Sequence, residues 1–134
     1  MNEVLNRKIR ILKDYNNLCK HIDDLACDYG ELFTKATRIA QELKDDVSPA
    51  NHNNNSKVES FTIILAKKKE QLEKAVSKKQ RIDKALDKLG VRNKELVRRV
   101  AIEGVSIRRT SNDLNMDYKY SIKLYKKLIE RLEI

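Results

Sequence analysis

The sequence predicts an all-α protein that combines a long, coiled-coil-like helical hairpin with a C-terminal unit of short helices. Its 134 residues include only three glycines, one proline and no tryptophan, whereas Leu, Ile, Ala, Lys, Arg and Glu are plentiful. These plentiful residues favour helices, while β-sheets need more turn residues and more β-branched or aromatic side chains. Apolar residues also recur every seven positions over two long stretches, which indicates long amphipathic helices.

The first predicted helix covers residues 5–43. One column of its repeat holds Leu5, Leu12, Cys19, Ala26, Phe33 and Ala40, and the other holds Lys8, Tyr15, Ile22, Tyr29, Ala36 and Leu43. We expect this helix to bury more than one flank, because its stripe is widened by Ile9, Leu18, Leu25, Leu32 and Ile39. Gly30 is a candidate bend. Cys19 and Cys27 would lie about 12 Å apart in one helix, which is too far for a disulfide.

A polar loop is expected at residues 45–56, where proline and clustered asparagines interrupt the repeat. Ser56 and Glu59 fit a capping box, which predicts that the second helix starts there. The columns of its repeat are Val58, Leu65, Leu72, Lys79 and Leu86, and Phe61, Lys68, Ala75, Ile82 and Leu89, so two lysines interrupt the seam. Gly90 suits the left-handed position just past the helix end.

The two long helices, within residues 1–90, need a partner for their apolar stripes. They can pack on each other as an antiparallel hairpin, or join the same stripes of another chain. The pattern leaves both arrangements open, and we expect a homo-oligomer through residues 5–43 and 58–89. The outer face of the second helix interleaves lysines with acidic residues, and pairs such as Glu70–Lys74 are typical of a solvated helix face.

Positive charge is concentrated in the C-terminal part of the chain. The formal net charge is +9, with eight Lys or Arg against nine Asp or Glu in residues 1–56, and twenty-one against eleven in residues 57–134. A surface of this kind attracts phosphate backbones at long range. The charge distribution therefore predicts a polyanionic partner for the C-terminal part.

Three short helices are predicted in a C-terminal domain at residues 91–134: Asn93 to Glu103, Ser106 to Leu114 and Asp117 to Leu132. Gly104 can end the first helix, and Ser106 can cap the second. Asn115 can adopt the left-handed conformation in a tight turn, and Asp117 can cap the third helix. This spacing predicts a helix-turn-helix.

In a helix-turn-helix, two helices cross closely around a miniature core. Ser111 is the small residue that the crossing needs, and Asn115 is the left-handed residue of the turn. The expected miniature core consists of Ile107, Leu114, Met116 and Leu124. Ser121 occupies a place that commonly holds Val or Ile, and Thr110 is less apolar than its place suggests.

Residues 106–132, SIRRTSNDLNMDYKYSIKLYKKLIERL, resemble the DNA-reading region four of sigma factors. They also resemble the C-terminal end of ArpU- and RinA-type proteins, which are late-gene transcriptional regulators of phages in Gram-positive bacteria. The order of coil, polar loop, basic coil and terminal unit is similar to that of related phage proteins. The resemblance implies that the third short helix is a recognition helix for double-stranded DNA.

The same resemblance implies roles for individual side chains. Residues of the recognition helix that would enter the major groove are Tyr118, Lys119, Ile122 and Lys123, with Lys126 one turn further. Phosphate contacts are expected from Arg108, Arg109 and Lys127, and from Arg98 and Arg99 on the preceding helix. We interpret Tyr120 and Tyr125 as packing residues.

Other functional classes lack a pattern in this sequence. His21 and His52 are the only histidines, and neither lies at metal-ligand spacing from cysteines or carboxylates, so we expect no metal or other cofactor. No nucleophile is paired with a base, which argues against an enzyme. No apolar stretch approaches a signal peptide or a membrane span, so we expect no membrane contact and a location in the cytoplasm of a bacterial host cell.

The sequence therefore favours a phage-type transcriptional regulator whose coils pair two recognition helices at major grooves about 34 Å apart. One alternative is a DNA-packaging adaptor that resembles a small terminase subunit and forms large rings. Another is a coiled-coil protein that engages host RNA polymerase, or another protein, without touching DNA.

Overall fold

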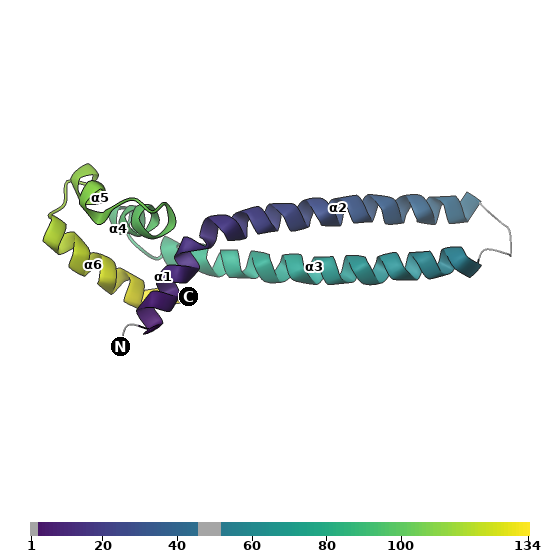
Figure 1. Cartoon of the computed structure of the whole chain (residues 1–134), viewed down its shortest axis with the longest axis horizontal. Helices are drawn as coiled ribbons and strands as arrows, with labels where there is room; N and C mark the ends of the chain where they lie inside the picture. Colours follow the sequence, from purple (N-terminus) through teal and green to yellow (C-terminus); the bar gives the residue numbers. More distant parts are fainter. Residues whose placement is uncertain (1–2, 46–51) are drawn as a thin grey trace. The chain divides into compact units, whose positions relative to one another are not determined.

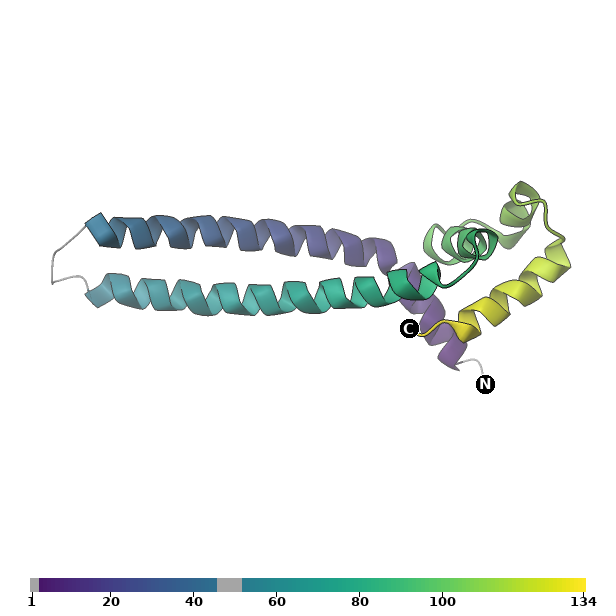
Figure 2. The same cartoon turned by 180° about the vertical axis from the view of Figure 1, so that it is seen from behind.

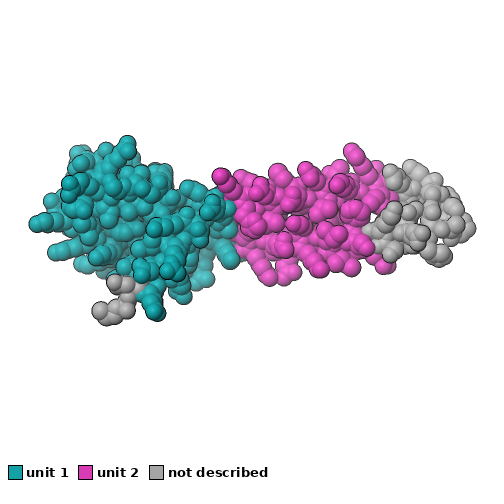
Figure 3. All heavy atoms as spheres, in the orientation of Figure 1, with its two compact units in different colours: residues 1–19, 77–134 teal, residues 20–76 magenta. Residues whose placement is uncertain are grey.

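The computed structural model describes residues 3–45 and 52–134, and these residues contain helices and no strand. The elements are α1 (Glu3–Lys13), α2 (Tyr15–Asp45), α3 (His52–Asp87), α4 (Val91–Val97), a π-helical segment η1 (Arg98–Ile102), α5 (Ile107–Asp113) and α6 (Tyr118–Arg131) (Figure 1). The predicted all-α class is confirmed. Contacts divide the chain into unit 1, residues 1–19 and 77–134, and unit 2, residues 20–76 (Figure 3).

Unit 2 consists of the parts of α2 and α3 that lie side by side and run in opposite directions (Figures 1 and 2). Leu25 and Ala75 are its buried apolar residues. Lys68, which interrupts the predicted seam, places its Nζ 3.8 Å from Asp28 Oδ2. This contact gives the charge of Lys68 an acidic partner within unit 2.

The inner face of α2 matches the predicted second column and the residues that widen the stripe, but not the first column. The residues that are at least partly buried are Ile22, Leu25, Tyr29, Leu32, Ala36 and Ile39, whereas the predicted column of Ala26, Phe33 and Ala40 is exposed. The buried positions alternate three and four residues apart, which keeps them on one side of the helix. The exposed column lies on the neighbouring flank of the same stripe.

Three predictions about where the long helices start, bend or end are wrong. α3 begins at His52, inside the expected loop and ahead of the Ser56 capping box, because adding residues to an existing helix costs little. Residues 46–51 of that loop lie outside the described residues. Gly30 lies inside the uninterrupted α2, and the helix divides at Asp14 instead. Gly90 is extended, with φ −62° and ψ 158°, and caps the start of α4.

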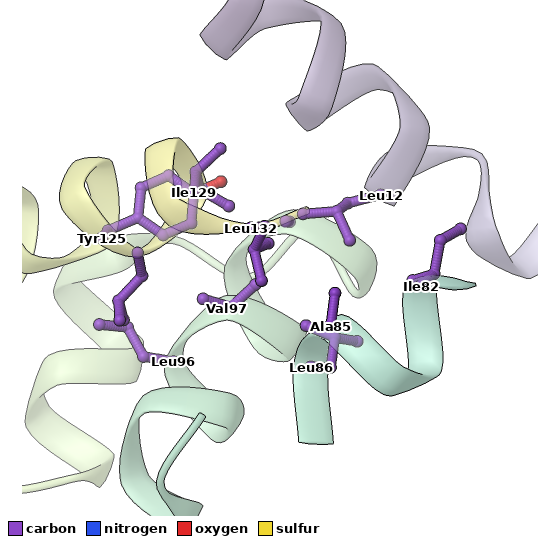
Figure 4. Close-up of a cluster of buried hydrophobic side chains, with 11 residues drawn as sticks. Leu12, Ile82, Ala85, Leu86, Leu96, Val97, Tyr125, Ile129 and Leu132 are labelled. Carbon is purple, nitrogen blue, oxygen red and sulfur yellow. The ribbon is translucent and has the colours of Figure 1, made fainter. Parts of the chain in front are cut away.

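Unit 1 is built around one apolar core to which four α-helices contribute (Figure 4). Leu12 of α1, Leu96 and Val97 of α4, and Ile129 of α6 are each 0% exposed. Ile82, Ala85 and Leu86 bring the end of α3 into the same cluster. The compact unit that holds α4 to α6 is thus larger than the predicted domain at residues 91–134, because it also takes in residues 1–19 and 77–90.

The predicted helix from Asn93 to Glu103 is an α-helix that continues as a π-helix. Glu103 N donates to Arg98 O at 3.0 Å, and Val105 N donates to Arg99 O at 2.9 Å. Gly104 follows with φ 72°, a conformation that favours glycine. Its predicted role at the end of this helix is confirmed.

Candidate nucleic-acid interface

The helices α5 and α6 are joined by a tight turn whose local geometry matches the predicted one. The Ser106 side chain accepts a hydrogen bond from Arg109 N at 3.2 Å and caps α5. The Asp117 carboxylate accepts one from Tyr120 N at 3.1 Å and caps α6. Asn115 adopts φ 55°, so the predicted left-handed turn residue is confirmed.

Small hydroxyl residues occupy fully buried positions in this pair of helices. Thr110, Ser111 and Ser121 are each 0% exposed. Their hydroxyls donate to the carbonyls of Ser106, Ile107 and Asp117 at 2.9, 2.6 and 2.8 Å. Ser121 is therefore a satisfied core residue, even though an aliphatic side chain is common at its place. The predicted miniature core also packs against the main core through Ile107, Leu114, Met116 and Leu124.

Two arginines outside α5 and α6 fix the turn between them. The Arg92 guanidinium donates to Leu114 O at 2.7 Å and to Asn115 O at 3.3 Å. Arg99 Nη1 lies 3.1 Å from Asp113 Oδ2 at the end of α5. The sequence does not single out Arg92, because nothing in the pattern around a lone arginine on a short helix indicates which carbonyl groups it will reach.

The exposed side of α6 carries four lysines, Lys119, Lys123, Lys126 and Lys127. They lie opposite the buried Ser121, Tyr125, Leu128 and Ile129, because successive residues of a helix are about 100° apart. Among the described residues, none of these lysines forms an ion pair, and the same holds for the exposed Arg109. Ile122 lies beside them, partly exposed. The sequence-predicted lysines are thus brought together on one face.

The tyrosines of α6 are distributed differently from the expectation. Tyr118 is 40% exposed, and the Arg108 guanidinium carbon lies 4.9 Å from the centroid of its ring. Tyr125 is buried, as predicted, and burial raises the pKa of its phenol. Tyr120 is 58% exposed, so its predicted packing role is wrong. Tyr120 is exposed because its position on α6 lies on a side of the helix that does not pack against the core.

Arg98 and Arg99 are held by acidic partners. Arg98 pairs with Glu95 at 2.9 Å and also with Glu103, and Arg99 Nε lies 3.2 Å from Glu95 Oε2. Hydrogen bonds from Arg98 hold the pKa of Glu95 below its usual range. Both arginines are only partly exposed. We therefore leave them out of the proposed phosphate contacts and interpret them as residues that position η1 and α5.

Several lysines outside α6 pair with carboxylates, whereas others, such as Lys67, Lys78 and Lys84, form no ion pair among the described residues. The lysine–carboxylate distances are 3.1 Å for Lys74–Glu70, 2.8 Å for Lys79–Asp83, 3.1 Å for Lys88–Glu133 and 2.6 Å for Lys94–Asp87. The first of these is the pair predicted on the solvated face. The lack of ion pairs is thus not special to α6, and what distinguishes its four lysines is their place on one face of a helix that follows a capped tight turn.

The part of the chain that the structure describes contains neither a metal-binding cluster nor a membrane span. Within residues 3–45 and 52–134, no group of three or more His, Cys, Asp or Glu side chains could hold a metal ion. None of the helices in these ranges combines the length and apolar character of a membrane span. No protein-family model, curated protein or solved structure matches the chain. The functional assignment therefore depends on the geometry of α5 and α6.

Proposed function

We propose that this chain binds double-stranded DNA through α5 and α6, and that α6 lies in the major groove as the recognition helix. The observation that carries the proposal is the face of unpaired lysines on α6, Lys119, Lys123, Lys126 and Lys127. This face follows a tight turn with a capped helix start and a fully buried Ser121. A rigid, cationic helix presented in this way suits groove entry and phosphate contact.

The side chains divide into two roles. The residues proposed to meet base edges lie on the first two turns of α6 and are Tyr118, Lys119, Ile122 and Lys123. Lysine can donate to guanine, and Ile122 can contact a thymine methyl. Phosphate contacts are assigned to Arg108, Arg109, Lys126 and Lys127, and the exposed Tyr120 lies close enough in sequence to join them. The Arg108 contact orients the Tyr118 ring.

The biological role that this chemistry fits is transcription regulation of the phage late-gene type. Support comes from the resemblance of residues 106–132 to sigma region four and to ArpU- and RinA-type regulators. We further propose that the protein acts as a homo-oligomer, because two recognition helices can then meet successive major grooves about 34 Å apart.

The test begins with selection of DNA sites from a random pool, followed by fluorescence anisotropy with the selected site and a random duplex. We expect wild-type protein to prefer the selected site, and Lys119→Ala with Lys123→Ala to remove that preference. Lys127→Ala should weaken binding to both duplexes and lower the slope of log affinity against log salt by about 0.9.

The matched control is Lys67→Ala with Lys69→Ala, which removes two exposed lysines from α3. This variant should keep the ratio of affinities for the selected and random duplexes. An unchanged ratio in the α6 variant, or an equal loss in both variants, would show that α6 does not read DNA. The absence of any DNA binding by wild-type protein would reject the proposal outright.

A further inference from the structure

An apolar groove in unit 1 is separate from the proposed DNA surface. It has a volume of about 420 Å³ and is lined by Ile11, Leu18, Ile82 and Ile134, together with Asp14, Lys78 and Arg81. Ile82 is buried, while the other three apolar residues are partly exposed and form the walls. The groove runs along the part of α3 that follows residue 77, beside the junction of α1 and α2.

The rim of the groove is positively charged. Lys78 and Arg81 are exposed, and neither forms an ion pair within the ranges that the structure describes. Asp14 is the one carboxylate among the lining residues. A second hollow of about 220 Å³ shares Arg81 and adds Lys84, Ala85, Lys88 and Glu133. The apolar walls therefore continue into a basic strip along α3.

The charges along the strip differ in whether they have acidic partners within unit 1. Lys79 is used inside unit 1, where its Nζ lies 2.8 Å from Asp83 Oδ2, and Lys88 pairs with Glu133. Lys78, Arg81 and Lys84 have no such acidic partner among the described side chains. Their charge is available to a binding partner.

We infer that this groove binds an acidic amphipathic helix of a partner protein. Apolar side chains at positions i, i+3, i+4 and i+7 of the partner helix would enter the groove and contact its apolar walls. Carboxylates beside them would pair with Lys78, Arg81 and Lys84. The apolar walls favour a peptide over nucleic acid, because phosphate contacts need only donors and charge. Lys78 to Lys88 spans about 15 Å of helix, so a partner segment of about ten residues covers the strip. This inference does not depend on DNA binding.

The experiment uses the full chain with carbon-13-labelled isoleucine methyl groups, observed by NMR. The probe is a synthetic helical peptide of about fifteen residues, four turns of helix, that presents leucines at i, i+3, i+4 and i+7 and glutamates beside them. We expect the methyl signals of Ile11, Ile82 and Ile134 to shift, while those of Ile63 and Ile64, exposed on α3 outside the groove, stay in place. A peptide with lysine in place of every glutamate should produce no shift.

The deciding variant is Lys78→Glu with Arg81→Glu, which should weaken peptide binding at least tenfold. Its control, Lys67→Glu with Lys69→Glu, makes a similar charge change on exposed positions of the same helix and should weaken it less than twofold. Circular dichroism checks that both variants stay helical. Retained preference for the selected DNA site in the groove variant would separate this inference from the proposed function.

Several outcomes would overturn the inference. Equal weakening in both variants would show general attraction between charges, and a missing shift at the three groove methyls would show that the peptide binds elsewhere or not at all. A shift caused by random duplex DNA but not by the peptide would assign the groove to nucleic acid. Methyl signals that change on dilution of the protein alone would assign it to a second copy of this chain.

Discussion

Leu12 tests whether α1 is an integral part of the unit that carries the proposed DNA surface. The side chain is 0% exposed and belongs to the same core cluster as Leu96, Val97 and Ile129 (Figure 4). Truncation of a buried leucine to alanine costs about 2–5 kcal/mol, and full burial places Leu12→Ala near the middle, at about 3 kcal/mol. For a domain of roughly 60–100 residues, the range that includes unit 1, each kcal/mol of lost stability lowers Tm by roughly 4–8 °C, so Tm should fall by roughly 12–24 °C.

Urea unfolding followed by far-ultraviolet circular dichroism measures the free energy of unfolding of each variant. The matched control is Val4→Ala on the same helix, where the side chain is 57% exposed and the expected change is within about 0.5 kcal/mol. A loss below about 1 kcal/mol for Leu12→Ala would refute the reasoning, because it would show that α1 frays from the core at little cost.

Three further substitutions follow from individual contacts. Asn115→Ala should cost about 1 kcal/mol in urea unfolding, because Asn115 has φ 55° and alanine pays more for that conformation; an unchanged stability would argue against the left-handed turn. Ser121→Ala should be tolerated, whereas Ser121→Leu should destabilise by about 1–3 kcal/mol, because this position is fully buried; equal stability of the two variants would contradict close packing there. The Tyr15 hydroxyl donates to Asp83 Oδ1 at 2.6 Å. Burial, and then this hydrogen bond, raises the pKa of Tyr15 to about 12, so its contribution to stability should be complete below about pH 10 and be lost between about pH 10 and 12. In Asp83→Asn, ultraviolet titration should show Tyr15 ionising at lower pH but still above an ordinary tyrosine, since burial remains; an unchanged titration would mean that the hydrogen bond has no effect.

The start and end signals of the short helices could be predicted because they act over a few residues. Ser106, Asn115 and Asp117 each satisfy backbone groups or adopt a backbone conformation that their own chemistry favours. Gly90 shows the limit of such reasoning. A glycine can end one helix or begin the next, and the chain enters α4 so soon after α3 that the second use prevails.

The heptad pattern predicted that α2 is amphipathic and assigned both columns to the seam, whereas in unit 2 only the second column, with Ile22 and Tyr29, is partly buried. Phe33 belongs to the first predicted column and Leu32 to the residues that widen the stripe, and Leu32 is partly buried whereas Phe33 is 54% exposed. The choice depends on the packing of α2 against α3, which periodicity alone does not contain. The same reason explains why the place of α1 in the core of unit 1 was not predicted. An apolar stripe predicts that one face of a helix is buried, but it does not identify the helices that pack against that face.

The basic residues of the candidate site could be identified from the sequence. Which of them lack an acidic partner, and so are free to contact DNA, could not be predicted. Arg98 and Lys123 look alike as basic residues of short helices. Arg98 is held by Glu95 and Glu103, whereas Lys123 is exposed without an ion pair among the described residues. The difference arises from acidic partners three and five residues from Arg98, which only the backbone geometry of α4 and η1 brings into reach.

The core of unit 1 ties the orientation of the proposed recognition helix to residues far away in the sequence. Ile129 and Leu132 of the α6 region share their cluster with Leu12 of α1 and Leu86 of α3. Lys8 of α1 also donates to Glu130 O at 2.7 Å, and a cation at this end of a helix offsets the negative end of its dipole. Substitutions in α1 can therefore change DNA affinity without any contact to DNA. Such an effect would follow the free energy of unfolding and leave the salt dependence of binding unchanged, whereas loss of an α6 lysine would lower the salt dependence and leave stability nearly constant.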